Sequence, residues 1–204
     1  MKNSLVCTFL LFTMLLTSCS STKIISSWRM PESHIHINEL SKVLIVALLD
    51  NEKNRFKAEH QIVKYLKGKG VVSHDYLTDD FNNKYKDQIT KKIKTDGFDG
   101  IVLMHLIDID KERDYAPSQR QYIEDDYKGF GDYYLKNNYN YKDSEYYINT
   151  QTYVLKTDIY SLKAEKIIWT GITETFEPPG IKKMTNEISK VIYKQMVQEG
   201  FIKN

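Results

Sequence analysis

Apolar positions along the chain alternate between short continuous runs and runs at helical spacing. Residues 42–49 read Lys-Val-Leu-Ile-Val-Ala-Leu-Leu, the kind of short apolar run that forms a strand covered on both faces. Asp50 and Asn51 then offer an N-cap, and Gly68 and Gly70 end the helical pattern that follows. Its apolar positions are Phe56, Ile62, Val63 and Leu66. The pattern predicts a strand followed by a helix.

The same alternation recurs directly afterwards. Residues 71–76 suit a second strand, and residues 100–107 suit a third. Between them, Tyr85, Ile89 and Ile93 space a second helix. A strand-helix-strand-helix-strand series implies right-handed crossovers and parallel pairing. We therefore expect three parallel strands with helices packed on them.

Two longer strands and a last helix complete the predicted fold. The strands span roughly residues 146–160 and 166–176, and the turn between them indicates an antiparallel hairpin. Apolar residues recur at helical spacing from Ile181 to Gln195, with Gly200 as a C-terminal cap. We predict a single α/β domain over residues 40–204, of α+β character because the sheet is mixed. Its order is β-α-β-α-β-β-β-α, with the helices packed on the sheet.

Residues 1–18 have the organisation of an export signal. Lys2 gives a cationic start, and an apolar run of about 12 residues leads to Cys19, too short for a membrane span of roughly 20 residues. Residues 16–19, Leu-Thr-Ser-Cys, resemble the bacterial lipobox. We predict cleavage before Cys19 and a covalent lipid on it, consisting of diacylglycerol and an N-acyl chain. A secreted protein with a chance cysteine is the alternative, which the flanking residues disfavour.

Lipidation at Cys19 determines the expected compartment. Two or three acyl chains anchor a protein stably at a membrane. Ser20, in place of Asp, resembles the pattern that directs lipoproteins to the outer membrane, and residues 20–23 lack an acidic run typical of surface exposure. We expect a periplasm-facing protein on the outer membrane. Residues 19–39 are predicted to be either a lipidated tether or an edge strand. Since Cys7 leaves with the signal, no disulfide is expected.

Tyrosine is concentrated between the third and fourth predicted strands. The chain has 15 tyrosines, and nine of them lie within residues 115–147, largely inside an insertion at about residues 108–145. Three interpretations stay open: a packed hairpin that covers its own aromatics, a protein-contact surface, and a platform for glycan stacking. For the contact surface, we predict five partner-binding residues: Tyr122, Tyr127, Phe130, Tyr133 and Tyr134. Phe130, Tyr133 and Tyr134 are its expected anchors.

Charge and motifs disfavour several function classes. The chain has 29 basic and 27 acidic residues, so nothing electrostatic indicates nucleic-acid binding. It lacks the nucleophile elbow G-x-S-x-G, the phosphate-binding P-loop, H-E-x-x-H and C-x-x-C. Ser73, His74 and Asp75 are the residue types of a hydrolase triad, but consecutive side chains of a strand point to opposite faces. We expect no enzymatic activity, and no cofactor besides the lipid on Cys19.

Histidines offer one candidate metal site. His34 and His36 lie on one side of an extended segment, where both imidazoles reach a zinc or copper ion. No third ligand is identified, so a solvated pair is the favoured interpretation. His105, in a predicted core strand, is expected to be a structural histidine with satisfied nitrogens.

Arg55 and Glu59 are four residues apart on the first predicted helix. This spacing favours an exposed pair on the helix face. A buried ion pair that fixes the helix to the sheet is the alternative.

One set of short motifs points to a family. It consists of Ser27-Trp28, residues 42–47, Arg55 with Glu59, Gly97-Phe98-Asp99-Gly100 and residues 168–171. The pattern resembles uncharacterised small lipoproteins of Bacteroidota over most of the predicted mature chain. The resemblance implies an α/β domain similar to the N-terminal domain of TolB, to the curli-secretion lipoprotein and to lipoprotein activators of peptidoglycan synthases. Those proteins bind or assemble with other proteins, and no catalytic residue is known in the family.

The sequence therefore predicts a non-enzymatic envelope lipoprotein that presents its α/β domain to a protein partner through the tyrosine-rich insertion. The alternative is a lipoprotein that binds a small molecule, a glycan or a metal, with His34 and His36 or the insertion as the site. The expected partners are the membrane, through the lipid, and an envelope protein, with no nucleic acid.

Overall fold

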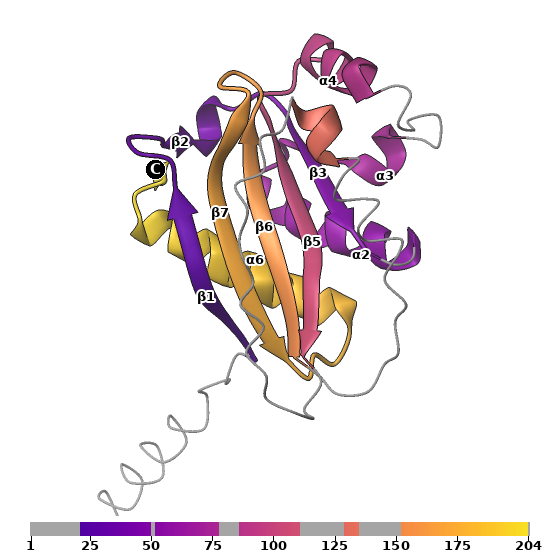
Figure 1. Cartoon of the computed structure of the whole chain (residues 1–204), viewed down its shortest axis with the longest axis vertical. Coiled ribbons are helices and arrows are strands. Elements are labelled where there is room, and N and C mark those ends of the chain that lie inside the picture. The colour runs from indigo at the N-terminus through magenta and orange to yellow at the C-terminus, as the bar shows by residue number, and fades with distance from the viewer. Residues whose placement is uncertain (1–20, 50–51, 78–85, 111–128, 135–151, 204) are drawn as a thin grey trace, which may run out of the picture.

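A computed structural model describes residues 21–49, 52–77, 86–110, 129–134 and 152–203. Its centre is a six-stranded mixed sheet with helices on both faces (Figure 1). The α/β class with a mixed sheet is confirmed. In order across the sheet, the strands are β1 (Thr22–Arg29), β7 (Lys166–Phe176), β6 (Thr152–Ser161), β5 (Gly100–Asp110), β3 (Val43–Leu48) and β4 (Gly70–Val72).

Strand β3 is the buried centre of the parallel part of the sheet. All six of its residues are buried, and it pairs in parallel with β4 on one side and β5 on the other. The remaining pairs, β5 with β6, β6 with β7 and β7 with β1, are antiparallel. The continuous apolar run of residues 42–49 was therefore a sound indicator of a strand covered on both faces.

The second predicted strand was too long. Strand β4 ends at Val72, and the chain turns into the short helix α3 (Ser73–Tyr76). The cause is Glu59 of helix α2 (Glu52–Val63), whose carboxylate accepts hydrogen bonds from the Ser73 hydroxyl and from the His74 N–H. A carboxylate that binds these first donors fixes the start of a helical turn.

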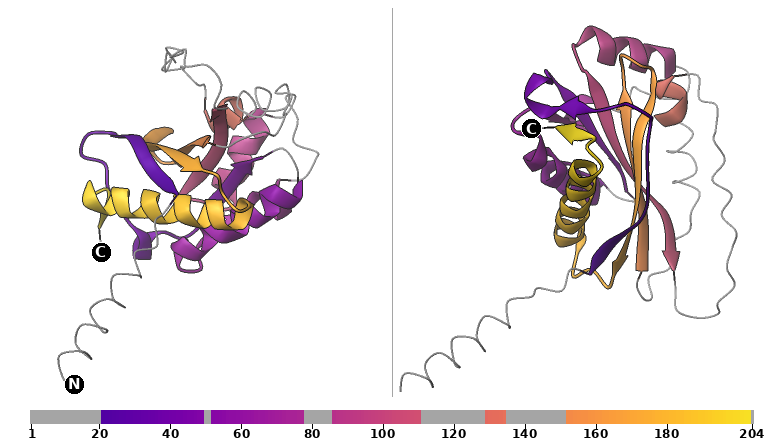
Figure 2. Two further views of the ribbon diagram at one scale, coloured as in Figure 1. Left: turned by 90° about the horizontal axis from the view of Figure 1, so that it is seen from below. Right: turned by 90° about the vertical axis from the view of Figure 1, so that its left-hand side faces the viewer.

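Helices cover both faces of the sheet. The long helix α6 (Ile181–Gln198) lies beside α2 on one face (Figure 2). Trp169 of β7, Ile188 of α6 and Phe201 are fully buried between the sheet and these helices. The opposite face is covered by helix α4 (Lys86–Thr95) and by a helical turn at residues 130–134. Among the described residues, no helix has the length and apolar character that a membrane crossing requires.

The segment after the predicted lipidation site is an edge strand, one of the two alternatives for residues 19–39. Strand β1 pairs with β7, with a bulge at Ile25. The chain then forms β2 (Ile35–His36), which pairs in parallel with β8 (Ile202–Lys203) at the other end of the chain, and the turn η1 (Ile37–Glu39). Gly200 has a φ of 67°, and the Phe201 N–H donates to the Met196 carbonyl, as the predicted C-terminal cap requires.

Candidate functional site

Strand β1 is one of the two edges of the sheet, and β4 is the other. Within the part of the chain that the structure describes, no strand pairs with its outer side. Ile25 and Trp28 on this strand are 45% and 49% exposed. Edge strands are usually shielded by charged residues or proline. Lys23 at the start of β1 is such a residue and pairs with Glu174 of β7, but residues 24–28 contain neither a charged residue nor a proline. An open edge with large exposed apolar side chains is typical of a contact surface.

Helix α6 holds β1 at both of its ends. At the start of the strand, the hydroxyls of Ser21 and Thr22 donate to Glu187, at 3.0 and 3.2 Å. At its end, the Arg29 guanidinium donates to the Glu199 carbonyl at 2.6 Å, and the Ser27 hydroxyl donates to the Glu199 carboxylate. The strand is thus fixed before any partner arrives, which lowers the entropic cost of binding along its edge.

Glu199 is the centre of the tie at the end of β1. Its carboxylate also accepts hydrogen bonds from Trp169 Nε1 at 2.6 Å and from Gln195 Nε2 at 2.7 Å. Burial acts to raise the pKa of this carboxyl, but the hydrogen bonds and the nearby Arg29 charge outweigh burial and hold its pKa below the usual range. Sequence reasoning missed Glu199, because its partners on β1 are far from it along the chain.

The expected anchors of a partner surface, Phe130, Tyr133 and Tyr134, are instead buried, at 0%, 1% and 6% exposure. The Phe130 ring packs against that of Tyr160, with 5.7 Å between centroids. Their apolar area covers the sheet face opposite α6, so their burial argues against the predicted contact role, which stays a prediction. Tyr122 and Tyr127 lie outside the described residues.

A buried polar cluster lies beneath these aromatic side chains. Asp158 of β6 is fully buried, accepts a hydrogen bond from the Tyr133 hydroxyl and pairs with Lys156 at 3.2 Å. Nearby on β5, burial lowers the pKa of His105 to about 4, an effect that Asp158 opposes and Lys156 reinforces. His105 Nδ1 has no hydrogen-bond partner among the described residues, so the expectation of satisfied nitrogens was wrong. This histidine is neutral at pH 7.

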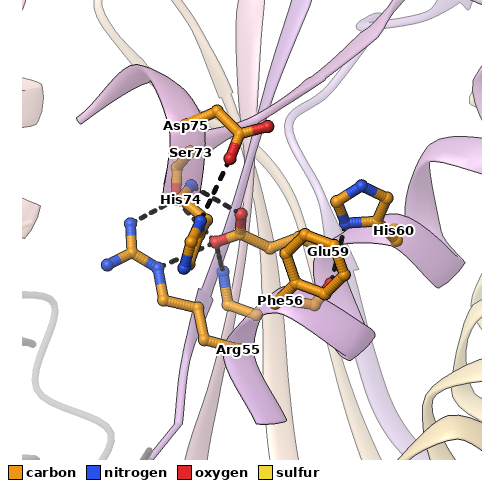
Figure 3. Close-up of polar contacts among 8 residues, drawn as sticks. Arg55, Phe56, Glu59, His60, Ser73, His74 and Asp75 are labelled. Atoms are coloured by element: carbon orange, nitrogen blue, oxygen red, sulfur yellow. Dashed lines mark hydrogen bonds and ion pairs between the residues drawn. The ribbon is translucent and has the colours of Figure 1, made fainter. Parts of the chain in front are cut away.

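Glu59 is the second buried carboxylate, and it fastens α2 to the sheet (Figure 3). It is fully buried and accepts hydrogen bonds from the Ala47 N–H, the Arg55 Nε and the Ser73 hydroxyl, at 3.1, 3.1 and 2.6 Å. The favoured interpretation of an exposed pair between Arg55 and Glu59 was wrong, and the alternative of a buried ion pair is confirmed. Spacing alone did not show it, because three further donors, the Ala47 N–H of β3 and the Ser73 hydroxyl and His74 N–H of α3, come from other elements.

Ser73, His74 and Asp75 do not form a catalytic triad. They lie in the helical turn α3, so the strand argument against a triad does not apply. The Ser73 hydroxyl donates to Glu59, and its own oxygen accepts from Arg55 at 2.7 Å, while His74 Nδ1 lies 3.1 Å from Asp75 Oδ1. Figure 3 shows these contacts. The Ser73 hydroxyl thus directs its proton to Glu59 and not to His74, and Ser73 is fully buried, whereas a triad needs an accessible hydroxyl whose proton passes to the histidine.

His34 and His36 are close together on the segment that contains β2. Their rings meet edge to face with 5.7 Å between centroids, and His34 Nδ1 lies 3.2 Å from the Glu32 carbonyl oxygen. Among the described residues, no group of three potential ligands is placed to hold a metal ion. The metal site therefore stays a prediction without a third ligand.

The comparisons with known proteins concern the fold. No family model matches the chain, and no curated protein matches it. Among solved structures it is similar to the PelC dodecamer protein of Paraburkholderia phytofirmans, at 6% identity and a TM-score of 0.43, over 84% of this chain and 94% of that one. It is also similar to lipoprotein GNA1162 of Neisseria meningitidis, at 8% identity and a TM-score of 0.36, over 78% and 99%.

The sequence identities and TM-scores of both proteins are too low to assign the role or the assembly of either one to this chain. The more specific resemblance to lipoproteins of Bacteroidota and to the TolB N-terminal domain stays a prediction.

Proposed function

We propose that the chain is a lipid-anchored envelope protein whose α/β domain binds an extended segment of a protein partner along β1. The observation that supports this proposal is the open, preformed edge of β1 with exposed Ile25 and Trp28. Backbone N–H and C=O groups at a sheet edge are matched best by another extended backbone, and flanking apolar side chains supply the pockets. Tryptophan is among the residues that contribute most to such contacts.

Variants that place charge on the edge test the proposal. The lipidated chain is solubilised from membranes and used to capture proteins, with Ile25→Lys and Trp28→Lys as test variants, since lysine on an edge strand opposes pairing. Phe56→Lys is the matched control, because Phe56 is exposed to a similar degree, 42%, but lies on α2. We expect one envelope protein to be captured by the wild type and by Phe56→Lys, and to be lost from both β1 variants. Capture of the same protein by all four chains would contradict the proposal.

A further inference from the structure

Exposed lysines gather in an open groove between helices α2 and α6. The groove has a volume of about 860 Å³ and is lined by α2, by the turn η2 (Lys64–Leu66) that follows it, and by the first residues of α6. Its lysines are Lys57, Lys64, Lys182 and Lys183, and none of its lining residues is acidic. The whole chain has 29 basic and 27 acidic residues, so this concentration of positive charge is local. It favours an anionic ligand or surface.

The spacing of the residues explains why they share one groove. Lys57, His60 and Lys64 are three and four residues apart, so they lie on one face of the helical segment. The first turn of α6, on the other side of the groove, holds no acidic residue. A hydrogen bond from Gln61 Nε2 to Asn186 Oδ1, at 3.0 Å, joins the two helices within the groove. The two sides are therefore held in register.

The positive charge of the groove is largely uncompensated. All four lysines are exposed. Within the ranges that the structure describes, their one ion pair joins Lys183 to Glu187 at 3.9 Å, and the Lys183 side chain stays 64% exposed. Such exposed pairs contribute little. Lys64 donates to the neutral amide oxygen of Gln61, which leaves its charge in place. The groove can therefore offer these charges to an outside anion.

The groove lies beside the predicted anchor. The Ser21 hydroxyl donates to one carboxylate oxygen of Glu187, and Lys183 Nζ approaches the other oxygen. Cys19 precedes Ser21 by two residues, which span roughly 7 Å at most. At the same end of the sheet, the Phe176 N–H donates to the Ser21 carbonyl at 3.0 Å, and the chain passes from there into α6 (Figure 1). A bilayer that holds a lipid on Cys19 is thus within reach of the groove.

A lipid anchor and a basic surface act together at a membrane. Each lysine near an anionic leaflet strengthens binding roughly fivefold. Phe176, which is 52% exposed, adds an aromatic ring at the same end of the domain, where such rings favour the headgroup region. An acidic protein segment offers similar charge, but the predicted anchor places a membrane, and no such segment, beside Ser21.

We infer that the lysine groove binds the phosphate headgroups of anionic lipids in the bilayer that holds the Cys19 anchor. The inference rests on the lipid anchor of the proposed function and not on the contact along β1. It orients the domain, because the end at which β1 and α6 begin then faces the membrane.

Vesicle sedimentation tests the inference without the acyl chains. Residues 19–204 carrying Cys19→Ser contain every described residue, and their vesicle binding is measured separately from acylation. At about 0.1 M salt we expect binding to vesicles of phosphatidylglycerol and phosphatidylcholine in equal parts, and release at about 1 M salt, where the Debye length falls to about 3 Å. Vesicles of phosphatidylcholine alone should not bind. Absence of binding to the anionic vesicles, or equal binding to both compositions, would overturn the inference.

Two double variants with the same loss of charge locate the contact. Lys57→Gln with Lys182→Gln removes two groove lysines and should weaken binding to the anionic vesicles roughly 25-fold. Lys91→Gln with Lys163→Gln removes two exposed lysines from α4 and from the turn after β6, at the other end of the sheet (Figure 1). This control should change affinity by about twofold or less, because distant charges are screened. An equal loss of affinity in both double variants would overturn the inference.

Two soluble competitors separate a membrane from other anions. Glycerol phosphate carries the headgroup chemistry without a bilayer, and a tetraglutamate peptide carries the chemistry of an acidic protein segment. Each is added at the concentration of anionic lipid, and we expect neither to displace the vesicles. Displacement by glycerol phosphate would assign the groove to free phosphate, and displacement by the peptide would assign it to an acidic protein segment. Either result would overturn the inference.

Discussion

The hydroxyl of Ser73 donates a hydrogen bond to the carboxylate of Glu59 across 2.6 Å. This contact joins the turn after β4 to helix α2, and the same carboxylate also accepts from the Ala47 N–H on β3. One buried side chain thus connects three elements of the fold. It explains why the sequence Ser73-His74-Asp75 forms a helical turn in place of the end of a strand.

Replacing Glu59 by alanine is expected to destabilise the domain strongly. The change leaves Arg55 and two backbone N–H groups without their acceptor in a buried place, and loss of one partner of a buried ion pair costs about 3–5 kcal/mol. Urea unfolding measures this free energy. Lys57→Ala, an exposed change on the same helix, should stay within about 0.5 kcal/mol of the wild type. A Glu59→Ala variant as stable as Lys57→Ala would contradict the assigned role.

His105 makes the domain sensitive to acid. Its pKa is about 4 in the folded chain, against about 6.5 for an ordinary histidine. Because the unfolded chain binds the proton first, the stability from this group is complete above pH 6.5 and is lost as the pH falls toward 4. Between pH 7 and pH 5 the expected loss is about 2 kcal/mol.

Unfolding of wild type and His105→Leu at pH 7 and pH 5 measures this contribution. The variant should lose about 2 kcal/mol less than the wild type over that interval. His60→Leu, an exposed change on α2, should keep the acid sensitivity of the wild type. An identical pH dependence of stability in His105→Leu and wild type would show that folding does not lower the pKa of His105.

The aromatic residues near position 130 are expected to matter for stability. Phe130 is fully buried, so Phe130→Ala should cost about 3–5 kcal/mol. Phe176 is 52% exposed, and Phe176→Ala should change the free energy of unfolding by about 0.5 kcal/mol or less. Guanidinium unfolding of both variants compares them directly. If Phe130→Ala is as stable as the wild type but no longer binds a partner protein, Phe130 contacts that partner and the argument from burial is contradicted.

Hydrophobic patterning predicted most of the fold, because buried strands and amphipathic helices leave a local record in the sequence. The run at residues 42–49 and the helical spacing from Ile181 to Gln195 both correspond to observed elements. The pairing of β2 with β8 left no such record, since two residues per strand carry no periodicity.

The candidate site was less accessible to sequence reasoning. Residues 19–39 were predicted to be either a tether or an edge strand, but the exposure of Trp28 depends on the strand order of the sheet. The aromatic residues near Tyr133 indicated that this segment packs against another surface. The sequence did not show whether that surface belongs to the sheet of the same chain or to a partner protein. The sequence did not indicate that His105 Nδ1 lacks a hydrogen-bond partner, because this depends on which atoms surround it in three dimensions.

The two cysteines give matched variants for the anchor. We expect Cys19→Ser to abolish acylation and to release the protein from the membrane fraction, because that thiol is the predicted attachment point of the lipid. Cys7→Ser, a change within the predicted export signal, should leave acylation and fractionation unchanged. Labelling with a palmitate analogue, followed by membrane fractionation, measures both. Acylation of Cys19→Ser at the wild-type level would show that lipid is attached elsewhere.

Photo-crosslinking in intact cells tests the proposed β1 contact most directly. A photoreactive amino acid is placed at Trp28 on the edge strand, and at Phe56 as the control on α2. The proposal predicts an adduct from position 28 to a single segment of one envelope protein, mapped by mass spectrometry, and none to that protein from position 56. The absence of any adduct from position 28, or adducts only to a second copy of this chain, would contradict it.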